Sequence, residues 1–228
     1  MNVEEFVSEL KASMDCGDTD FGLFKVPTAI AVTWLIMLIL MVLTLVFVRN
    51  LKVHPTSKVQ MVVEWLVEFI INFFGGILGK EGAGYIPYLG TVLIYIVISN
   101  MIGLFGIIPP TKDMRVTAGL AVMSICLIEW SGIRRKGLKG WLKSFIEPMP
   151  LLLPINILEI GIRPLSLCMR LFGNVLGAYI VMELIKMVVP AVVPMVFSMY
   201  FDVFDGVIQA YVFVFLTSLF MKEKMEEA

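Results

Sequence analysis

Three long apolar runs restrict this chain to few possible folds. Residues 26–48 and 82–111 contain no charged side chain, and Glu129 is the only charged residue in 116–133. About 20 consecutive apolar residues are enough for a helix to cross the hydrocarbon core of a bilayer. With 59% of its 228 residues hydrophobic, the chain has too much apolar surface for a soluble core. We therefore expect an all-α polytopic membrane protein.

Charge and composition exclude several functions. The net charge is −1, whereas nucleic-acid binding needs a concentrated basic face. The three cysteines, Cys16, Cys126 and Cys168, lack metal-type spacing, and His54 is the only histidine. We therefore expect no nucleic acid, no metal and no cofactor.

The distribution of charge along the chain predicts its orientation in the membrane. Residues 1–25 are acidic, whereas a signal peptide begins with basic residues, so residues 26–48 are interpreted as a retained, roughly upright first transmembrane helix. Lys and Arg gather after this span and in residues 134–146, and such loops stay in the cytoplasm. This places the N-terminus and the loop near 109–115 outside, and the tail 222–228 inside. Residues 82–133 then hold the second and third spans.

Residues 57–78 have the pattern of an amphipathic interfacial helix. Gln60, Glu64, Glu68 and Asn72 recur every four residues and form one polar stripe on an apolar helix. The stripe suits either a partner subunit or simple contact with lipid headgroups. Gly75 and Gly76 predict a stop to this helix.

Residues 147–221 carry many charges within apolar sequence and are interpreted as a helical hairpin. Pro190 and Pro194 divide it into helices near residues 150–188 and 194–221. At 1.5 Å per residue the first is too long to stand upright in a bilayer. We therefore expect a strongly tilted hairpin.

Arg170 is the most unusual residue of this hairpin. Ser166, Gly173 and Gly177 share its helix face and are small, and Asn174 lies one turn later. Such small residues allow another helix to approach closely. An ionisable group at membrane depth suggests a function. The alternatives are that Arg170 pairs with an acid on another helix and that the glycines form an ordinary packing motif.

Other charged residues fall at helical spacings. Glu159 is four residues before Arg163 and can neutralise it, whereas Arg170 has no acid four residues away on either side.

The last helix carries acids of its own. Asp202, Asp205 and Gln209 line one face, and Glu183 adds a carboxylate on the preceding helix. Carboxylates in a partly hydrated membrane cavity relay protons or coordinate a cation. The alternative is that Asp202 and Asp205 cap the helix near the outer surface.

The stretch "RPLSLCMRLFGN" at residues 163–174 resembles subunit a of the F-type ATP synthase, the stator channel subunit. The likeness extends to "SNMIGLFGIIPPTKDMRVTAGLAV" at 99–122, "KGLKGWLKSFIEPMPLLLPINILE" at 136–159 and "YFDVFDGVIQAYVFVFLTSLF" at 200–220. Together these stretches cover nearly the whole chain beyond about residue 50.

The resemblance implies a non-catalytic, ion-translocating subunit in a bacterial inner membrane. Its implied partners are a c-subunit ring, peripheral-stalk b subunits and the rest of the ATP synthase. Two offset aqueous half-channels would carry the ion to and from ring carboxylates, which pass the essential stator arginine, Arg170, while ionised. Ser166, Gly173 and Gly177 would face the ring. The ion-pathway residues would be Asn174, Glu183, Asp202, Asp205, Gln209, Asn100, Asp113 and Glu159.

This sequence also departs from the family pattern. Tyr179 stands where many relatives carry an acid or histidine, with Glu183 one turn later, and Asp202 stands where many carry a histidine. Glu159 lies about one turn closer to Arg170 than the equivalent acid of relatives.

The sequence leaves open the coupling ion and two alternative functions. The coupling ion is a proton or a sodium ion. A stand-alone secondary cation carrier and an intramembrane enzyme using Asp202 and Asp205 are the alternative functions. No internal repeat typical of carriers is evident, and no serine, cysteine and histidine group accompanies the two acids.

Overall fold

The computed structural model describes residues 18–21, 24–48, 58–79, 81–105, 107–144, 153–188 and 197–226. Within these ranges, six helices are long and apolar enough to cross a membrane. The predicted all-helical membrane architecture is confirmed at this level. A short antiparallel hairpin precedes the helices and was not predicted from the sequence; it consists of β1 (Asp18–Phe21) and β2 (Phe24–Pro27).

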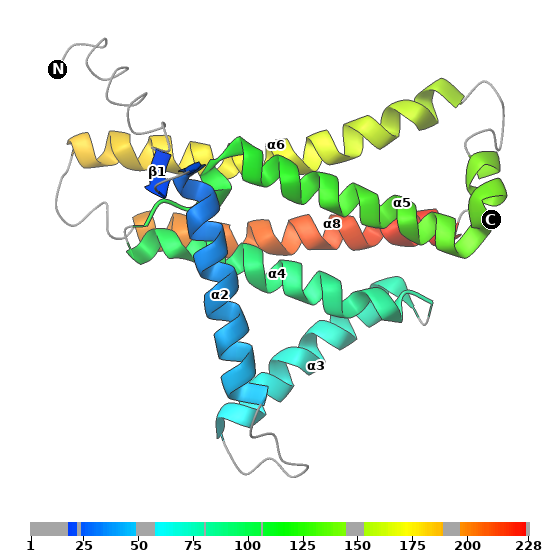
Figure 1. Cartoon of the computed structure of the whole chain (residues 1–228), viewed down its shortest axis with the longest axis horizontal. Helices are drawn as coiled ribbons and strands as arrows, with labels where there is room; N and C mark the ends of the chain where they lie inside the picture. Colours follow the sequence, from blue (N-terminus) through cyan, green and yellow to red (C-terminus); the bar gives the residue numbers. More distant parts are fainter. Residues whose placement is uncertain are drawn as a thin grey trace.

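The first helix, α2 (Thr28–Val48), runs across the other long helices rather than alongside them (Figure 1). Most of its side chains are exposed, and only Ala29 and Ile36 are buried hydrophobic residues. The Tyr95 hydroxyl donates a hydrogen bond to Oγ1 of Thr33, 3.3 Å away, and so links α2 to α4 (Ile86–Met101). Its exposed apolar surface is suited to lipid.

Helix α3 (Lys58–Leu78) continues through Gly75 and Gly76, so the predicted stop at that pair is wrong. The chain leaves the helix at Gly79, whose φ of +66° is readily adopted only by glycine. The Gly79 amide still donates to the carbonyl of Gly75 at 3.0 Å. A 3-10 turn, η1 (Ala83–Tyr85), then leads into α4.

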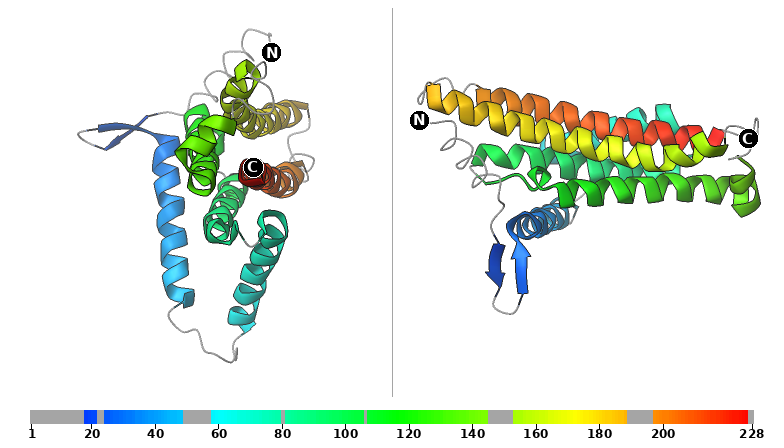
Figure 2. Two further views of the ribbon diagram at one scale, coloured as in Figure 1. Left: turned by 90° about the vertical axis from the view of Figure 1, so that its right-hand side faces the viewer. Right: turned by 90° about the horizontal axis from the view of Figure 1, so that it is seen from above.

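Four helices lie lengthwise beside one another: α4, α5 (Met114–Ser144), α6 (Leu153–Val188) and α8 (Gly206–Glu226) (Figure 2). Large apolar side chains between them are fully buried: Ile96 of α4, Ile128 of α5, Leu171 of α6, and Phe213 and Met221 of α8. Helices α6 and α8 run in opposite directions side by side, as the two arms of a hairpin. Pro190 and Pro194 lie outside the described residues.

Two breaks shape the long helices. Within α5, Gly137 has φ 71° and ψ 165°, so the helix changes direction there and continues to Ser144 through residues expected to form the basic loop. After this break, Nε1 of Trp141 donates to Oε2 of Glu129 at 2.7 Å. Pro164 lies inside α6 and cannot donate the usual helical hydrogen bond, which favours a bend.

Two short 3-10 helices join α4 to α5, namely η2 (Ile102–Phe105) and η3 (Pro110–Lys112). Helix α8 is preceded by a π-helix, η5 (Met199–Asp205). These three segments meet near the same ends of α4 and α6, where the structure forms its polar cavity.

Candidate functional site

Arg170 lies on α6 at the edge between a packed side and an open side. Leu167, Cys168 and Leu171 are buried, whereas Ser166 and Gly173 are exposed. Arg170 itself is half-buried. Its buried neighbours therefore anchor the helix, and Arg170 lies beside the exposed residues of the open side.

The small residues of this face do not pack against the described part of the chain. A methyl group added at Gly173 or Gly177 would meet no atom within 4 Å. Ser166 and Gly177 are also exposed. These glycines therefore form no ordinary packing motif with the residues that the structure describes. We call Ser166, Arg170, Gly173 and Gly177 the open stripe of α6.

Arg170 has no ion pair and no hydrogen bond from its side chain to any other residue that the structure describes. The alternative in which it pairs with an acid on another helix is therefore not realised within these residues. An unpaired guanidinium at the boundary of a single chain is a group that a further molecule can contact.

A cavity of about 380 Å³ lies between α4, α6, η5 and the α4–α5 connection. We call it the polar cavity. Its polar lining residues are Asn100, Lys112, Asn174, Tyr179, Ser198, Asp202, Asp205 and Gln209. Five of the predicted ion-pathway residues are thus brought together, from segments far apart in the sequence.

Asn100 joins three segments beside this cavity. Its Nδ2 donates to the Gly206 carbonyl at 3.0 Å, and its Oδ1 accepts from Oγ1 of Thr111 at 2.8 Å. Asn100 and Thr111 are both buried. A Cβ on Gly206 would lie only 2.9 Å from that of Asn100, so glycine allows this close approach of η5 and α8 to α4.

The acids of the cavity lie on η5. Asp202 accepts a hydrogen bond through Oδ2 from the Ser198 hydroxyl at 2.6 Å. Its other oxygen lies close to Gly103, where an added Cβ would be 3.1 Å from it. Asp205, one residue before α8, is half-buried in the same cavity. Both carboxylates therefore belong to one polar space.

A buried cation lines the same cavity as these acids. Lys112 is 5% exposed, and its ammonium lies 3.6 Å from the centroid of the Tyr179 ring. Such a cation–π contact is favourable, and more so where water is scarce. Lys112 has further interactions of its own. It ties the α4–α5 connection to α6.

Asn174 and Gln209 connect α6 to α8 at the other side of the cavity. Nδ2 of Asn174 donates to Oε1 of Gln209 at 2.6 Å. Gln209 is 3% exposed, and its Nε2 is buried without a hydrogen-bond partner in the structure. One turn of α6 separates this pair from Arg170.

A second polar cluster lies at the opposite end of the hairpin. Nη2 of Arg163 donates to Oε2 of Glu159 at 2.8 Å and to Oε1 of Glu223 at 2.7 Å. The pairing of Glu159 with Arg163 follows the predicted four-residue spacing. We call Glu159, Arg163 and Glu223 the Arg163 cluster.

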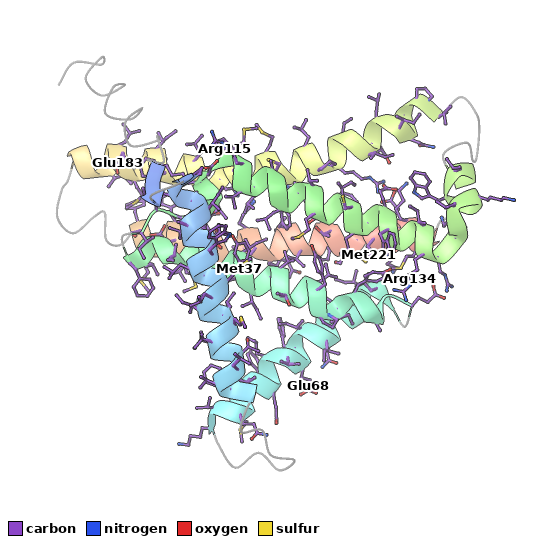
Figure 3. All side chains as sticks on the ribbon, in the orientation of Figure 1. Met37, Glu68, Arg115, Arg134, Glu183 and Met221 are labelled. Carbon is purple, nitrogen blue, oxygen red and sulfur yellow. The ribbon has the colours of Figure 1, made fainter. Side chains whose placement is uncertain are left out.

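Three predicted pathway residues lie outside the polar cavity: Asp113, Glu183 and Glu159 of the Arg163 cluster. The Asp113 side chain accepts from the backbone amide of Arg115 at 2.8 Å and stabilises the start of α5. Glu183 is half-buried farther along α6, near the end where Arg115 also lies (Figure 3). Arg134 lies at the opposite end of α5. Glu183 and Arg115 therefore mark the cavity end of the bundle.

Sequence reasoning missed several cavity and cluster residues. Lys112 and Thr111 belong to a connection with no periodicity, and Ser198 precedes the expected acid face. Glu223 was placed in the cytoplasmic tail. The signal for Ser198 was its position four residues before Asp202, whereas no local signal relates Glu223 to a residue 60 positions earlier.

The comparisons with known proteins agree along nearly the whole chain. The profile of the ATP synthase A chain family matches residues 30–222. ATP synthase subunit a of Moorella thermoacetica is 35% identical over 201 residues, covering 88% of this chain and 91% of that protein. A sodium-ion-specific ATP synthase subunit a of Propionigenium modestum is 32% identical over 225 residues, covering 91% and 78%.

These matches decide among the functions considered for the sequence. They support neither a stand-alone carrier nor an intramembrane enzyme, because the matched proteins are subunits of a larger complex. The chain therefore belongs to the ATP synthase A chain family, as a multi-pass, non-catalytic, ion-translocating stator subunit of the F0 sector.

Proposed function

We propose that this chain forms two offset aqueous half-channels with a ring of c subunits, and that Arg170 separates them. Ions would reach ring carboxylates from the polar cavity and leave at the other end of the hairpin after nearly a full rotation. The observation that carries this proposal is the half-buried Arg170 on the open stripe of α6, whose side chain has no ion pair or hydrogen bond to the described residues. Either protons or sodium ions suit this scheme.

The open stripe supports a ring partner. Its glycines have open space beyond them in this chain, so a helix of another subunit can pass close to the α6 backbone. Large apolar side chains on the same helix, such as Leu165 and Met169, are exposed and suit a membrane-embedded contact. A rotating neighbour also needs a surface without interlocking side chains, which the small residues of the stripe provide.

The charge of Arg170 supports its role between the half-channels. A guanidinium keeps its proton, so it favours ionised ring carboxylates and repels a cation that would leak directly across. An ion pair between the guanidinium and a ring carboxylate at 4 Å is worth about 4 kcal/mol at an effective dielectric of 20. The energy available from one charge crossing a membrane potential of 100 mV is smaller, about 2.3 kcal/mol. A dry, tight pair would therefore stall rotation. A half-buried arginine that stays partly hydrated avoids this stall.

The polar cavity supports an access path on the outer side. Asp202 and Asp205 supply carboxylates, and Asn100 and Gln209 supply amides, within one space of about 380 Å³. Groups of this kind relay protons or replace the hydration shell of a cation. Glu183 and Asp113 would lie toward the mouth of this path, and Glu159 would serve the inner side.

Helix lengths support a tilted hairpin. Helix α6 has 36 residues, which corresponds to about 54 Å, whereas the hydrocarbon core is about 30 Å thick. It therefore fits the membrane only at a steep tilt, and α8 beside it would share that tilt. Helix α2, which crosses them in Figure 1, would then be the upright one.

The remaining parts of the proposal concern orientation and partners. The exposed Arg134, Arg135 and Lys139 at the end of α5 favour a cytoplasmic location for that end and an outside N-terminus. The setting would be a bacterial cell membrane. Peripheral-stalk b subunits would bind elsewhere on the chain, and the exposed polar side chains of α3, Glu64 and Glu68 among them, suit such a contact.

The test is to replace Arg170 with alanine in the complete complex. We expect the complex to assemble while ATP-driven ion transport in membrane vesicles is lost. Arg115→Ala is the matched control, because Arg115 is exposed outside the open stripe and the polar cavity. Transport that survives in an assembled Arg170→Ala complex would refute the proposal.

A further inference from the structure

Helix α6 carries two arginines in opposite surroundings. The Arg163 side chain is 9% exposed, donates to two carboxylates, and its guanidinium carbon lies 4.8 Å from the centroid of the Phe220 ring. Arg170 has none of these partners among the described residues. One arginine is thus neutralised inside the chain and the other is left uncompensated.

The two arginines lie close enough to compete for the same partner. They are seven residues apart, which is two turns and about 10 Å of helix. Positions seven apart differ by only about 20° around the helix axis. A carboxylate that travels along this side of α6 would therefore meet Arg163 as well as Arg170, were both free.

We propose that Glu159 and Glu223 mask the charge of Arg163, so that Arg170 is the arginine of α6 that meets ring carboxylates without a charge partner among the described residues. The two acids are then specificity-determining residues: they select which arginine acts as the stator charge. This inference rests on the proposed function, because it assumes that ring carboxylates pass along the open stripe.

The geometry makes the masking redundant. Both carboxylates accept from the same nitrogen, Nη2 of Arg163, while Nη1 is buried and has no hydrogen-bond partner among the residues that the structure describes. Loss of either acid leaves Arg163 paired with the other. Glu223 comes from α8, so the masking also spans the hairpin. The two acids should therefore compensate for each other, and only their joint loss should expose the charge.

Neighbouring charges do not replace this masking. On α8, Lys222 and Lys224 flank Glu223 and add positive charge, and each has contacts of its own. On α5, Glu129 accepts the hydrogen bond from Trp141. The pairing of Arg163 thus depends on Glu159 and Glu223.

The test compares Glu159→Gln, Glu223→Gln, the double variant and a triple variant that adds Arg163→Gln, all in the complete complex. Glutamine keeps the shape of glutamate and removes only its charge. Assembly is followed on native gels, and ATP-driven ion uptake is measured in membrane vesicles. Arg170→Ala is carried in parallel, because its outcome tests the proposed function and not the masking.

We expect slower uptake for Glu159→Gln, because this acid also serves the inner path, and near-normal uptake for Glu223→Gln. The double variant should lose a further factor on the order of tenfold relative to Glu159→Gln, which corresponds to about 1.4 kcal/mol of extra retention of a ring carboxylate. Removing the exposed cation in the triple variant should restore uptake. Uptake should return to the level of Glu159→Gln, and this rescue assigns the loss to the exposed charge where the double variant has assembled normally.

Four results would overturn the masking. Three are uptake in the double variant equal to that of Glu159→Gln, uptake in the triple variant as low as in the double, and failure of both to assemble. A fourth is a double variant that alone fails to assemble, because an unpaired buried guanidinium destabilises the fold without any ring.

Discussion

Gly206→Ala is the sharpest test of how α8 is positioned against α4. The added Cβ would lie 2.9 Å from Cβ of Asn100, a distance shorter than two such atoms accept. Either the helices move apart or Asn100 shifts. Both responses disturb the bonds of Asn100 to the Gly206 carbonyl, at 3.0 Å, and to Thr111, at 2.8 Å.

The size of the effect follows from three contributions. Overpacking of a buried site costs about 1–3 kcal/mol. Weakening of a buried hydrogen bond costs about 1 kcal/mol more. Alanine is more favourable than glycine in a helix by about 0.5–1 kcal/mol, which offsets the second term. The net loss is therefore about 2 kcal/mol, or about 4–8 °C in the thermal midpoint of a chain of this length.

Gly173→Ala is the matched control within the same chain. A methyl group at Gly173 meets nothing within 4 Å, so the helix gains the alanine preference without a clash. We expect no loss of thermal stability. Because Gly173 lies on the open stripe, we expect slower ATP-driven ion transport, since the methyl group narrows the gap to the ring.

The assay heats the solubilised complex and follows the fraction of this chain that stays in the native band. Transport is measured separately in vesicles. The close contact between α4 and α8 would be refuted by an unchanged midpoint in Gly206→Ala. A midpoint lowered equally in Gly173→Ala would refute the open stripe instead.

Two further substitutions probe the polar cavity through ATP-driven transport in vesicles. Tyr179→Leu removes the aromatic ring beneath the Lys112 ammonium; because this contact is worth about 1 kcal/mol, we expect transport to fall several-fold. Tyr179→Phe keeps the ring and should transport ions normally. An equal loss in both variants would assign the effect to the hydroxyl. Asn174→Ala removes the 2.6 Å bond to Gln209 and leaves a buried amide oxygen without its donor, at a cost of about 1–3 kcal/mol. We expect slower transport with normal assembly, and an unchanged rate would show that this bond does not support the pathway.

The membrane-spanning helices could be predicted from the sequence alone, because the thickness of the bilayer fixes how many apolar residues a spanning helix needs. It also related Glu159 to Arg163, since residues four apart on a helix are neighbours. The same rule placed Asp202, Asp205 and Gln209 together, and all three line the polar cavity. Local periodicity is enough for relations of this kind.

Contacts between distant segments were beyond such reasoning. Glu223 reaches Arg163 across the hairpin, and no sequence spacing encodes that distance. Lys112 sits in a connection whose path depends on the bonds of Asn100 and Thr111. The end of α3 at Gly79 was missed because Gly75 and Gly76 are also glycines, and glycine is the residue that favours a helix end. Only the positive φ of Gly79 distinguishes it from the other two.

The π-helix before α8 has a consequence for how this part of the protein can vary. Its amide at Gly206 bonds the carbonyl of Phe201, five residues back, so the turn holds one residue more than an α-helix would. Deleting a single residue there would restore α-helical winding and rotate everything upstream by about 100° relative to α8. Asp202 would then leave the cavity while Gln209 stayed in place. The extra residue therefore sets the direction in which η5 presents Asp202 relative to α8.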